Sequence, residues 1–189
     1  FPDSGSVPLI CDMSSDILSH QVDFNQLAMF YAGAQKNLGP SGVTLVVLRD
    51  DMLGRINNGL PTIFDYRTHA EKKSLFNTPP SFTIYVVKLI LEWIQDQGGL
   101  KAVEDNNRKK KDVIYNLIDA NPDYFRAPVR ENSRSWMNIV LRLSSEELEQ
   151  KFILEAKAEG LIGLKGHRSV GGIRVSLYNA MTLEGAEKV

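Results

Sequence analysis

Lys36 is the residue of this sequence whose type and surroundings most readily support chemistry. It follows the apolar run 29–34 and stands among alanine and glycine residues. Burial of an ammonium group is costly unless the group gives up its proton, and a lysine that does so is a nucleophile able to form a Schiff base with an aldehyde. The alternative is a strand-end lysine that pairs with a surface carboxylate, and spacing alone leaves both interpretations open.

A carboxylate stands in the corresponding place after an earlier apolar run, where Asp12 follows residues 7–11. The ends of neighbouring parallel strands line one edge of a sheet, where α/β proteins bind ligands. An amine and a carboxylate at that edge are the pair that pyridoxal phosphate requires, the amine for its aldehyde and the carboxylate for its pyridine nitrogen. The alternative for Asp12 is a turn or a helix cap.

Asn77 and Thr78 stand directly before two prolines and the strongest helical pattern of the chain, residues 81–97. Such side chains, beside free amides at a helix N-terminus, can cradle a phosphate group. The alternative is ordinary helix capping by one of these two residues.

A basic, glycine-rich segment occupies residues 164–174 and contains no acidic residue. Its basic side chains are those of Lys165, His167, Arg168 and Arg174. Arginine grips a carboxylate or a phosphate with two parallel hydrogen bonds, so the segment predicts a site for an anionic ligand. Alternation along a strand places Arg174 on the face opposite Ile173 and Val175. The alternative is a solvated basic loop.

The elements that must hold these residues follow from the apolar pattern. Continuous apolar runs predict strands at residues 7–11, 29–34 and 43–48. Unbroken apolar strands favour a mostly parallel sheet that helices cover on both faces. Apolar spacing near 3.6 residues predicts helices over 81–97 and 100–119, and residues 49–80 are expected to be mostly irregular. An α/β fold is therefore expected for the first part of the chain.

The second part of the chain has a different pattern. Apolar side chains at alternate positions of 136–143 and 173–177 predict strands that are buried on one face. Ser144 and Glu147 have the spacing of a capping box, for a helix that runs to Gly160. A small α+β domain is expected here, with the domain division at 1–99 and 100–189.

Composition excludes several classes of protein. The chain has 189 residues, of which 43% are hydrophobic and 24% charged, and its net charge is −1. A near-neutral chain lacks the basic surplus of a dedicated nucleic-acid binder. No uncharged apolar stretch approaches the roughly 18 residues of a membrane span. The single cysteine, Cys11, fits a reducing compartment, and a cytoplasmic location is expected.

Other polar residues predict no chemistry. The run Arg108-Lys109-Lys110-Lys111 lies on an expected helix and is interpreted as a solvated face. Cys11 is interpreted as a buried strand residue. His20 and His69 have no partners at metal-ligand spacing, so no metal site is predicted.

Four motifs together resemble the phosphoserine aminotransferases, a family of class V, fold type I, pyridoxal-phosphate-dependent aminotransferases. They are CDMSS at 11–15, YAGAQKNLGPSG at 31–42, FNTPP at 76–80 and KGHRSVGGIR at 165–174. The resemblance implies the C-terminal part of such an enzyme. Residues 1–99 would belong to the cofactor-binding large domain and residues 100–189 to the small α+β C-terminal domain.

The resemblance also implies how the cofactor is held. Lys36 matches the lysine that forms the Schiff base and later moves a proton, Asp12 the partner of the pyridine nitrogen, and Gln35 a ligand of the cofactor phosphate. Asn77 and Thr78 match residues that reach the cofactor phosphate of a neighbouring subunit. A homodimer with shared active sites follows from that match.

The substrate residues are carried over in the same way. His167 and Arg168 match the grip on a substrate phosphate or distal carboxylate, and Arg174 matches the anchor of the α-carboxylate. The implied reaction passes an amino group from L-glutamate to 3-phosphohydroxypyruvate, which gives O-phospho-L-serine and 2-oxoglutarate in serine biosynthesis. The near-neutral charge and the lack of a long apolar stretch leave no nucleic-acid and no membrane partner expected.

The chain is expected to be a piece of a longer protein, because members of the resembled family are nearly twice its length. Activity of the chain alone is therefore not expected unless a second polypeptide supplies the rest. Two alternatives remain open. One is another class V enzyme, a desulfurase or lyase, and the other is a non-catalytic fragment that serves dimerisation or folding.

Overall fold

The computed structural model describes residues 1–189, which form two compact units. The first unit holds residues 1–17 and 22–93, and the second holds residues 18–21 and 94–189. The division falls inside a helix, a few residues before the boundary expected from the sequence. The assignment of these parts to a large and a small domain stays a prediction.

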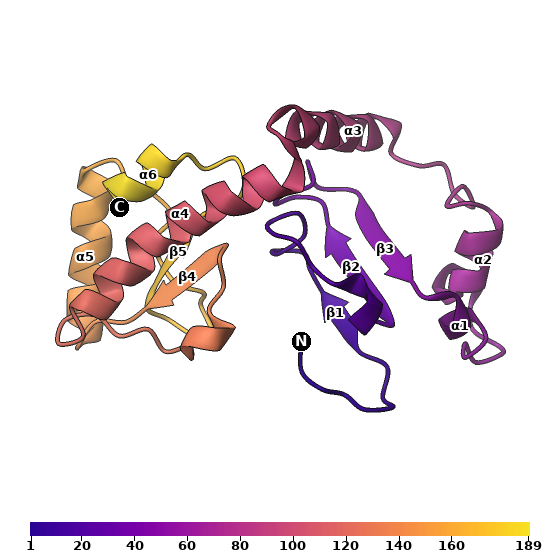
Figure 1. The fold of residues 1–189 in the computed structure, drawn as a ribbon, viewed down its shortest axis with the longest axis horizontal. Coiled ribbons are helices and arrows are strands. Elements are labelled where there is room, and N and C mark those ends of the chain that lie inside the picture. Colours follow the sequence, from indigo (N-terminus) through magenta and orange to yellow (C-terminus); the bar gives the residue numbers. More distant parts are fainter. The chain divides into compact units, whose positions relative to one another are not determined.

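The first unit contains a three-stranded sheet in the order β1-β2-β3 (Figure 1). Its strands are β1 (Ile10–Asp12), β2 (Met29–Gly33) and β3 (Thr44–Leu48). β1 and β2 are parallel, with Asp12 opposite Tyr31, and β3 pairs antiparallel with β2. The three apolar runs therefore form strands as predicted, and the parallel pair brings the ends of β1 and β2 to the same edge.

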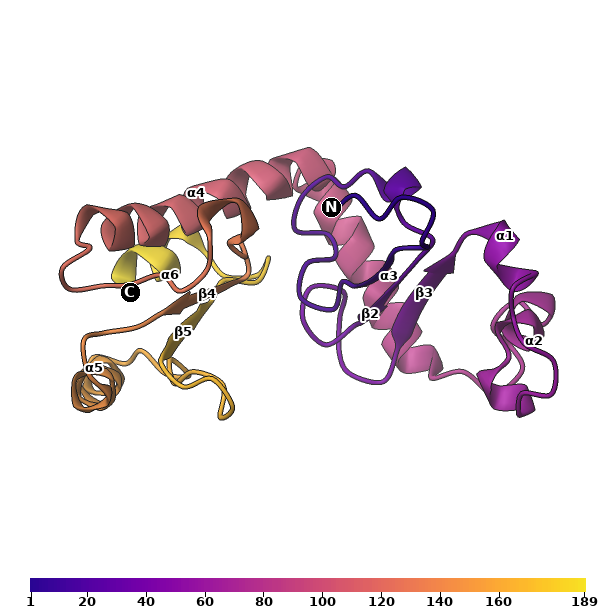
Figure 2. The same ribbon diagram turned by 90° about the horizontal axis from the view of Figure 1, so that it is seen from below.

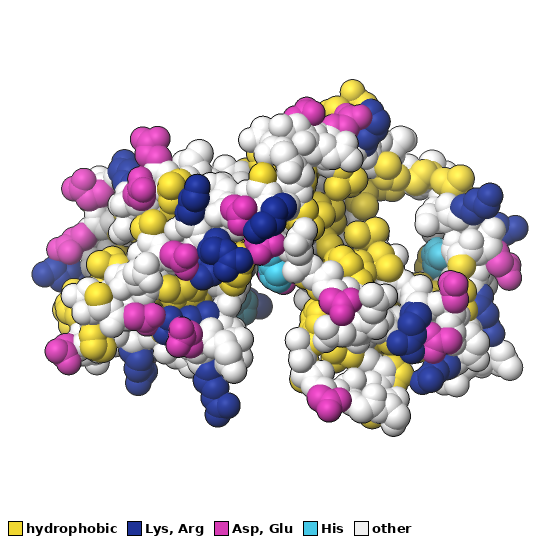
Figure 3. Space-filling view, viewed as in Figure 1, with side chains coloured by type: hydrophobic (Ala, Val, Ile, Leu, Met, Phe, Trp, Pro, Cys, Tyr) yellow, Lys and Arg dark blue, Asp and Glu magenta, His cyan; other side chains and the backbone are white.

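The expectation that helices cover both faces of this sheet is wrong for the chain as it stands. Ala32 on β2 is completely buried, but Leu45 and Val47 on β3 remain 37% and 42% exposed. Hydrophobic atoms are visible at the surface over β3 (Figure 3). The continuous apolar pattern of β3 predicted burial, and no element of this chain provides it.

Three α-helices follow the sheet: α1 (Asp50–Leu53), α2 (Tyr66–Glu71) and α3 (Ser81–Asp96). The helix predicted over 81–97 is confirmed to within one residue. The segment 49–80 is mostly irregular, as expected, apart from the short helices α1 and α2. A β-carbon at Gly39 would lie 3.2 Å from Val87, so the turn after β2 packs closely against α3.

The second unit is a two-stranded antiparallel sheet with helices (Figure 2). Its elements are α4 (Gly99–Ala120), β4 (Asn138–Leu141), α5 (Glu146–Ala158), β5 (Ile173–Ser176) and α6 (Leu183–Lys188). Ile139 and Ile173 are fully buried in a core to which α4 contributes Ile114 and Ile118. The α+β architecture predicted for this part is confirmed. None of the helices in either unit combines the length and hydropathy that a bilayer crossing requires.

The start of α5 differs from the expected capping box. Ser145, and not Ser144, is the N-cap, and its hydroxyl accepts a hydrogen bond from the Leu148 N–H at 3.3 Å. The capping residue is the one whose side chain reaches the free amides of the first turn, and that geometry fixes it one residue later.

The interpretation of the basic run on α4 as a solvated face is wrong for Lys110 and incomplete for Arg108 and Lys111, whereas Lys109 is exposed. Lys110 is completely buried and donates to the carbonyl oxygens of Leu177 and Tyr178 at 3.2 and 3.0 Å. Arg108 and Lys111 each lie 5.0 Å from the centre of the Trp136 ring, as cation–π partners. The run serves the packing of the second unit.

Burial lowers the pKa of Lys110 from 10.5 to about 8. Between these values the unfolded chain binds a proton that the folded chain does not, so the free energy of unfolding rises with pH there. We expect Lys110→Met to remove this rise, which amounts to roughly 3 kcal/mol between pH 7 and 10.5. Urea denaturation at several pH values measures it.

Lys109→Met is the matched control, because Lys109 is the exposed neighbour on the same helix. This variant should keep the pH dependence of the unsubstituted chain. If both variants keep the rise in stability, the buried amine is not its source.

Candidate active site

The loop that follows β1 is joined to the end of β2 by main-chain and side-chain hydrogen bonds. The Met13 N–H donates to the Tyr31 carbonyl at 2.8 Å, and the Gly33 N–H donates to Ser14 Oγ at 3.0 Å. Because β1 and β2 are parallel, these loops leave the sheet at the same edge. Asp12 and Lys36 therefore belong to one local structure, as the sequence predicted.

Lys36 lies in the turn after β2 and is held by the loop after β1. Its Nζ donates to Ser15 Oγ at 2.5 Å. The buried Asn37 fastens the same turn, because its Nδ2 donates to the Ile17 carbonyl at 3.0 Å. The amine is thus directed toward the loop that directly follows Asp12.

The Lys36 side chain is exposed in this chain, as is the Asp12 side chain. The predicted withdrawal of the amine from water is therefore wrong for the chain as it stands. The residues around the amine are small, and Ala32 and Ala34 are both completely buried, whereas the amine itself is exposed.

Asp12 is kept ionised by its neighbours. Hydrogen bonds from Ser14 contribute most to lowering the pKa of Asp12, and a hydrogen bond from Tyr31 and the positive charge of Lys36 lower it further. The same carboxylate raises the pKa of Tyr31. At neutral pH the Asp12 side chain is therefore a carboxylate anion. A carboxylate in this form would stabilise the protonated state of a pyridine nitrogen that faces it.

Gln35 folds back over the preceding glycine. A β-carbon at Gly33 would lie 2.6 Å from Gln35 Oε1, which is shorter than such contacts ever are. Any larger residue at position 33 would push Gln35 away from this place. The side chain of Gln35 is exposed, and its role toward a phosphate stays a prediction.

Asn77 and Thr78 lie in the loop before α3, and both are exposed. The helix begins at Ser81, so its N-cap position falls on Pro80 and on neither of these two residues. Ordinary capping therefore does not account for them, and their role toward a phosphate also stays a prediction.

In the second unit, residues 165–172 form a closed turn that we call the glycine loop. The Gly166 N–H donates to the Gly172 carbonyl, and the Val170 and Gly171 N–H groups donate to the His167 carbonyl. A β-carbon at Gly166 would lie 2.0 Å from the Gly171 carbonyl oxygen, so only glycine fits there.

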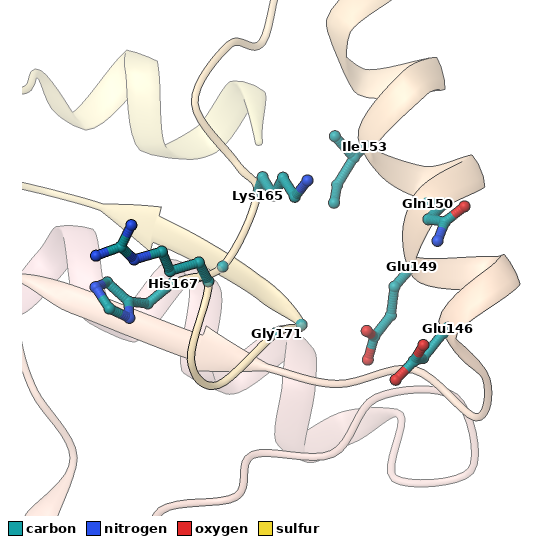
Figure 4. Close-up of a pocket in the computed structure, with 10 residues that line it drawn as sticks. Glu146, Glu149, Gln150, Ile153, Lys165, His167 and Gly171 are labelled. Atoms are coloured by element: carbon teal, nitrogen blue, oxygen red, sulfur yellow. The ribbon is translucent and has the colours of Figure 1, made fainter.

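The glycine loop and α5 line an open pocket of about 290 Å³ (Figure 4). Its lining includes Lys165, His167 and Arg168 from the loop and Glu146 and Glu149 from the helix. The argument from the sequence that this segment has no acidic neighbours is therefore incomplete, because folding brings two carboxylates to it. The His167 ring lies on the side of the loop that faces away from α5 (Figure 4).

The hydrogen bonds of His167 orient its ring. Nδ1 accepts from the Ser169 main-chain N–H at 3.3 Å and lies 2.7 Å from Ser169 Oγ. A main-chain N–H can only donate, so this arrangement assigns a proton to Nε2, where it can be donated to an anion.

Arg174 occupies the predicted face of its strand. Ile173 and Val175 are buried in the core, and Arg174 points to the opposite face of β5 and is half-buried. Its Nε is buried and has no hydrogen-bond partner. A buried guanidinium donor without an acceptor is costly, and it suits a site where an anion supplies the missing acceptor.

The predicted residues thus form separate groups. Asp12, Gln35 and Lys36 share one sheet edge in the first unit, and the glycine loop and Arg174 belong to the second unit. Sequence reasoning missed Ser15, Tyr31 and Asn37 as partners of the first group. The sequence could have indicated these three residues, because their hydroxyl and amide side chains stand in the same motifs, 11–15 and 31–42, as Asp12 and Lys36.

Comparison with known proteins identifies the family. The family described as Aminotransferase class-V matches residues 4–189. The phosphoserine aminotransferase of Niallia circulans is 55% identical over 187 residues. The solved phosphoserine aminotransferase from Bacillus circulans subsp. alkalophilus superposes with a TM-score of 0.91 at 55% identity. The PLP-bound enzyme from Trichomonas vaginalis does so with a TM-score of 0.90 at 37% identity.

The chain spans about half the length of the relatives it matches. The match covers 99% of this chain and 52% of both the Niallia circulans protein and the Bacillus circulans structure, and 100% of this chain and 53% of the Trichomonas vaginalis structure. The expected placement in the C-terminal part of such an enzyme is not supported by these coverages. They give the fraction of each relative that is matched and do not say which part of the relative it is. The match to the family extends over nearly every residue, and the chain belongs to the class V aminotransferases.

Proposed function

We propose that this chain is part of a pyridoxal-phosphate-dependent phosphoserine aminotransferase. Such an enzyme transfers an amino group from L-glutamate to 3-phosphohydroxypyruvate, giving O-phospho-L-serine and 2-oxoglutarate. The observation that carries the proposal is the amine of Lys36 at the same sheet edge as the ionised carboxylate of Asp12. The names of the relatives, one of them with PLP bound, support it.

The residues of this edge fit the cofactor. Lys36 supplies an amine for the aldehyde, Asp12 an anion for the pyridine nitrogen, and Gln35 an amide for the phosphate. When bound, PLP withdraws electrons from the substrate α-carbon. Lys36 Nζ would then take the proton from that α-carbon and deliver it to the C4′ atom of the cofactor. Asp12 would keep the pyridine nitrogen protonated meanwhile.

The second unit supplies groups for the substrate. Arg174 would bind the α-carboxylate, and its unpartnered Nε favours that role. His167 and Arg168 would bind the phosphate or distal carboxylate, with the Nε2 proton of His167 and the guanidinium as donors. Two anionic ends on the substrate match two separate sets of donors.

Two further parts of the proposal concern the assembly. Asn77 and Thr78, exposed before α3, would reach the cofactor phosphate of a second subunit in a homodimer with shared active sites. A cytoplasmic location is in keeping with the single cysteine and the metabolic reaction.

Reduction of the chain with borohydride in the presence of PLP tests the proposal. The expected product is a stable secondary amine between the cofactor and Lys36, found by mass spectrometry of the digested protein. No label would favour the alternative of a non-catalytic piece that serves dimerisation or folding. A label on another lysine would contradict the assignment of Lys36.

A second class V activity, that of a desulfurase or lyase, is the remaining alternative. Lys36 and Asp12 would serve it equally well, but the basic glycine loop favours a substrate with two anionic ends. O-phosphoserine should therefore compete for the site much better than serine. Equal competition by the two compounds would favour the alternative.

Asp12→Asn is expected to slow transamination about a hundredfold, because the neutral amide no longer stabilises the protonated pyridine ring. The borohydride label on Lys36 should still form, since the amine is unchanged. Steady-state rates of the active assembly measure the first effect and mass spectrometry the second. An unchanged rate would show that Asp12 does not face the ring, and Asp16→Asn on the same loop is the control.

A further inference from the structure

Arg142 connects three parts of the second unit. It directly follows β4, and its Nε donates to Glu149 Oε1 on α5 at 2.6 Å. Its terminal nitrogen donates to the Val170 carbonyl of the glycine loop at 3.0 Å. The side chain therefore ties the loop to the helix and to the end of the strand.

Glu149 is committed to holding Arg142. Its side chain is only 6% exposed, and the same Oε1 also accepts the Leu143 N–H at 3.2 Å. A buried carboxylate with two donors, one of them charged, has a single stable orientation. Glu149 thus neutralises Arg142 and leaves the other guanidinium nitrogens aimed at the loop.

The glycines of the loop make room for Arg142. A β-carbon at Gly172 would lie 2.6 Å from Arg142 Cδ, and one at Gly171 would lie 3.5 Å from its terminal nitrogen. Both glycines have positive φ, at +75° and +74°. The backbone of the loop therefore rests directly on the arginine side chain.

We infer that Arg142, anchored by Glu149, is a positioning residue that fixes the glycine loop for the binding of an anionic group. It does not line the pocket itself. The inference rests on the proposed function only in assigning a substrate anion to this loop.

Hydrogen exchange of the loop amides tests the positioning role directly in the chain. The N–H groups of Gly166, Val170 and Gly171 are hydrogen-bonded within the loop and report its closure. In Arg142→Met they should exchange about tenfold faster, because one charged hydrogen bond to the loop is lost. Glu149→Ala should act in the same direction, and Glu149→Gln should act less, since it keeps an acceptor oxygen.

Arg134→Met is the matched control. Arg134 is also paired with a carboxylate, Asp119, at 2.6 Å, and it packs on the Tyr115 ring. It makes none of the hydrogen bonds of the loop. Its replacement should leave exchange of the three loop amides unchanged, whereas equal acceleration in both variants would reveal only a general loss of stability and overturn the inference.

Binding of inorganic phosphate, followed by titration calorimetry, tests the consequence. Arg142→Met should bind it about tenfold more weakly than the unsubstituted chain, and Arg134→Met should bind it equally well. Unchanged exchange together with unchanged affinity in Arg142→Met contradicts this inference alone. Absence of phosphate binding in the unsubstituted chain contradicts the proposed assignment of the loop to the substrate.

Discussion

Lys36→Ala is expected to abolish the borohydride-stable label and to lower transamination by about four orders of magnitude in the active assembly. The amine is the only group at the edge of the parallel strands that can both condense with an aldehyde and carry a proton. Ser15 accepts its hydrogen bond at 2.5 Å but is a hydroxyl and cannot replace it. Mass spectrometry and steady-state rates measure the two effects.

Lys36→Arg provides the matched control for charge. It keeps a cation beside Asp12 and Ser15, so folding and the local hydrogen bonds should persist. The guanidinium remains protonated and does not condense with the aldehyde, so the label and the activity should still be lost. Retained labelling in either variant would assign the chemistry to a different lysine.

Much of the fold could be predicted from local pattern. The strands around 10–12, 29–33 and 44–48 and the helix at 81–96 follow from continuous apolar runs and helical spacing, which depend on nearby residues alone. Asp12 and Lys36 were brought together by one further rule, that parallel strands end at one edge. The exposure of β3 and of Lys36 in this chain could not be predicted in this way, because burial depends on what packs over them.

Lys110 shows a signal that was present and overlooked. The buried residues Val103, Asn107, Lys110, Ile114 and Ile118 are three or four positions apart on α4 and share one face. Helical phase therefore placed Lys110 on the buried side, although its neighbours are charged. The charged composition of residues 108–111 led to the interpretation of a solvated face. The helical spacing of the buried residues would have corrected that interpretation for Lys110.

Glu149 and Arg142 lacked such a signal. They lie before the glycine loop in sequence, on a helix and at a strand end, and no spacing rule relates them to residues 165–172. Only the packing of α5 against the loop places the carboxylate at the pocket. Tertiary contacts of this kind are the part of the site that sequence reasoning did not reach.

The chain alone is expected to show no measurable transamination, and a polypeptide that covers the unmatched half of the Niallia circulans relative is expected to restore it on mixing. Lys36 is exposed, and large apolar side chains are exposed on both β3 and α3, including Val47, Phe82 and Tyr85. Exposed apolar surface of this kind marks an interaction site. Its burial by the added polypeptide would also exclude water from the amine.

Three mixtures decide this prediction, with amino transfer from glutamate as the measurement. The unsubstituted chain with the added polypeptide should be active, either polypeptide alone should be inactive, and the Lys36→Ala chain with the added polypeptide should be inactive. Val47→Asp, at an exposed position of β3, should weaken the association, whereas Lys109→Met on the second unit should not. Full activity of this chain alone would contradict the prediction, because it would mean that an exposed amine and an uncovered sheet suffice for the reaction.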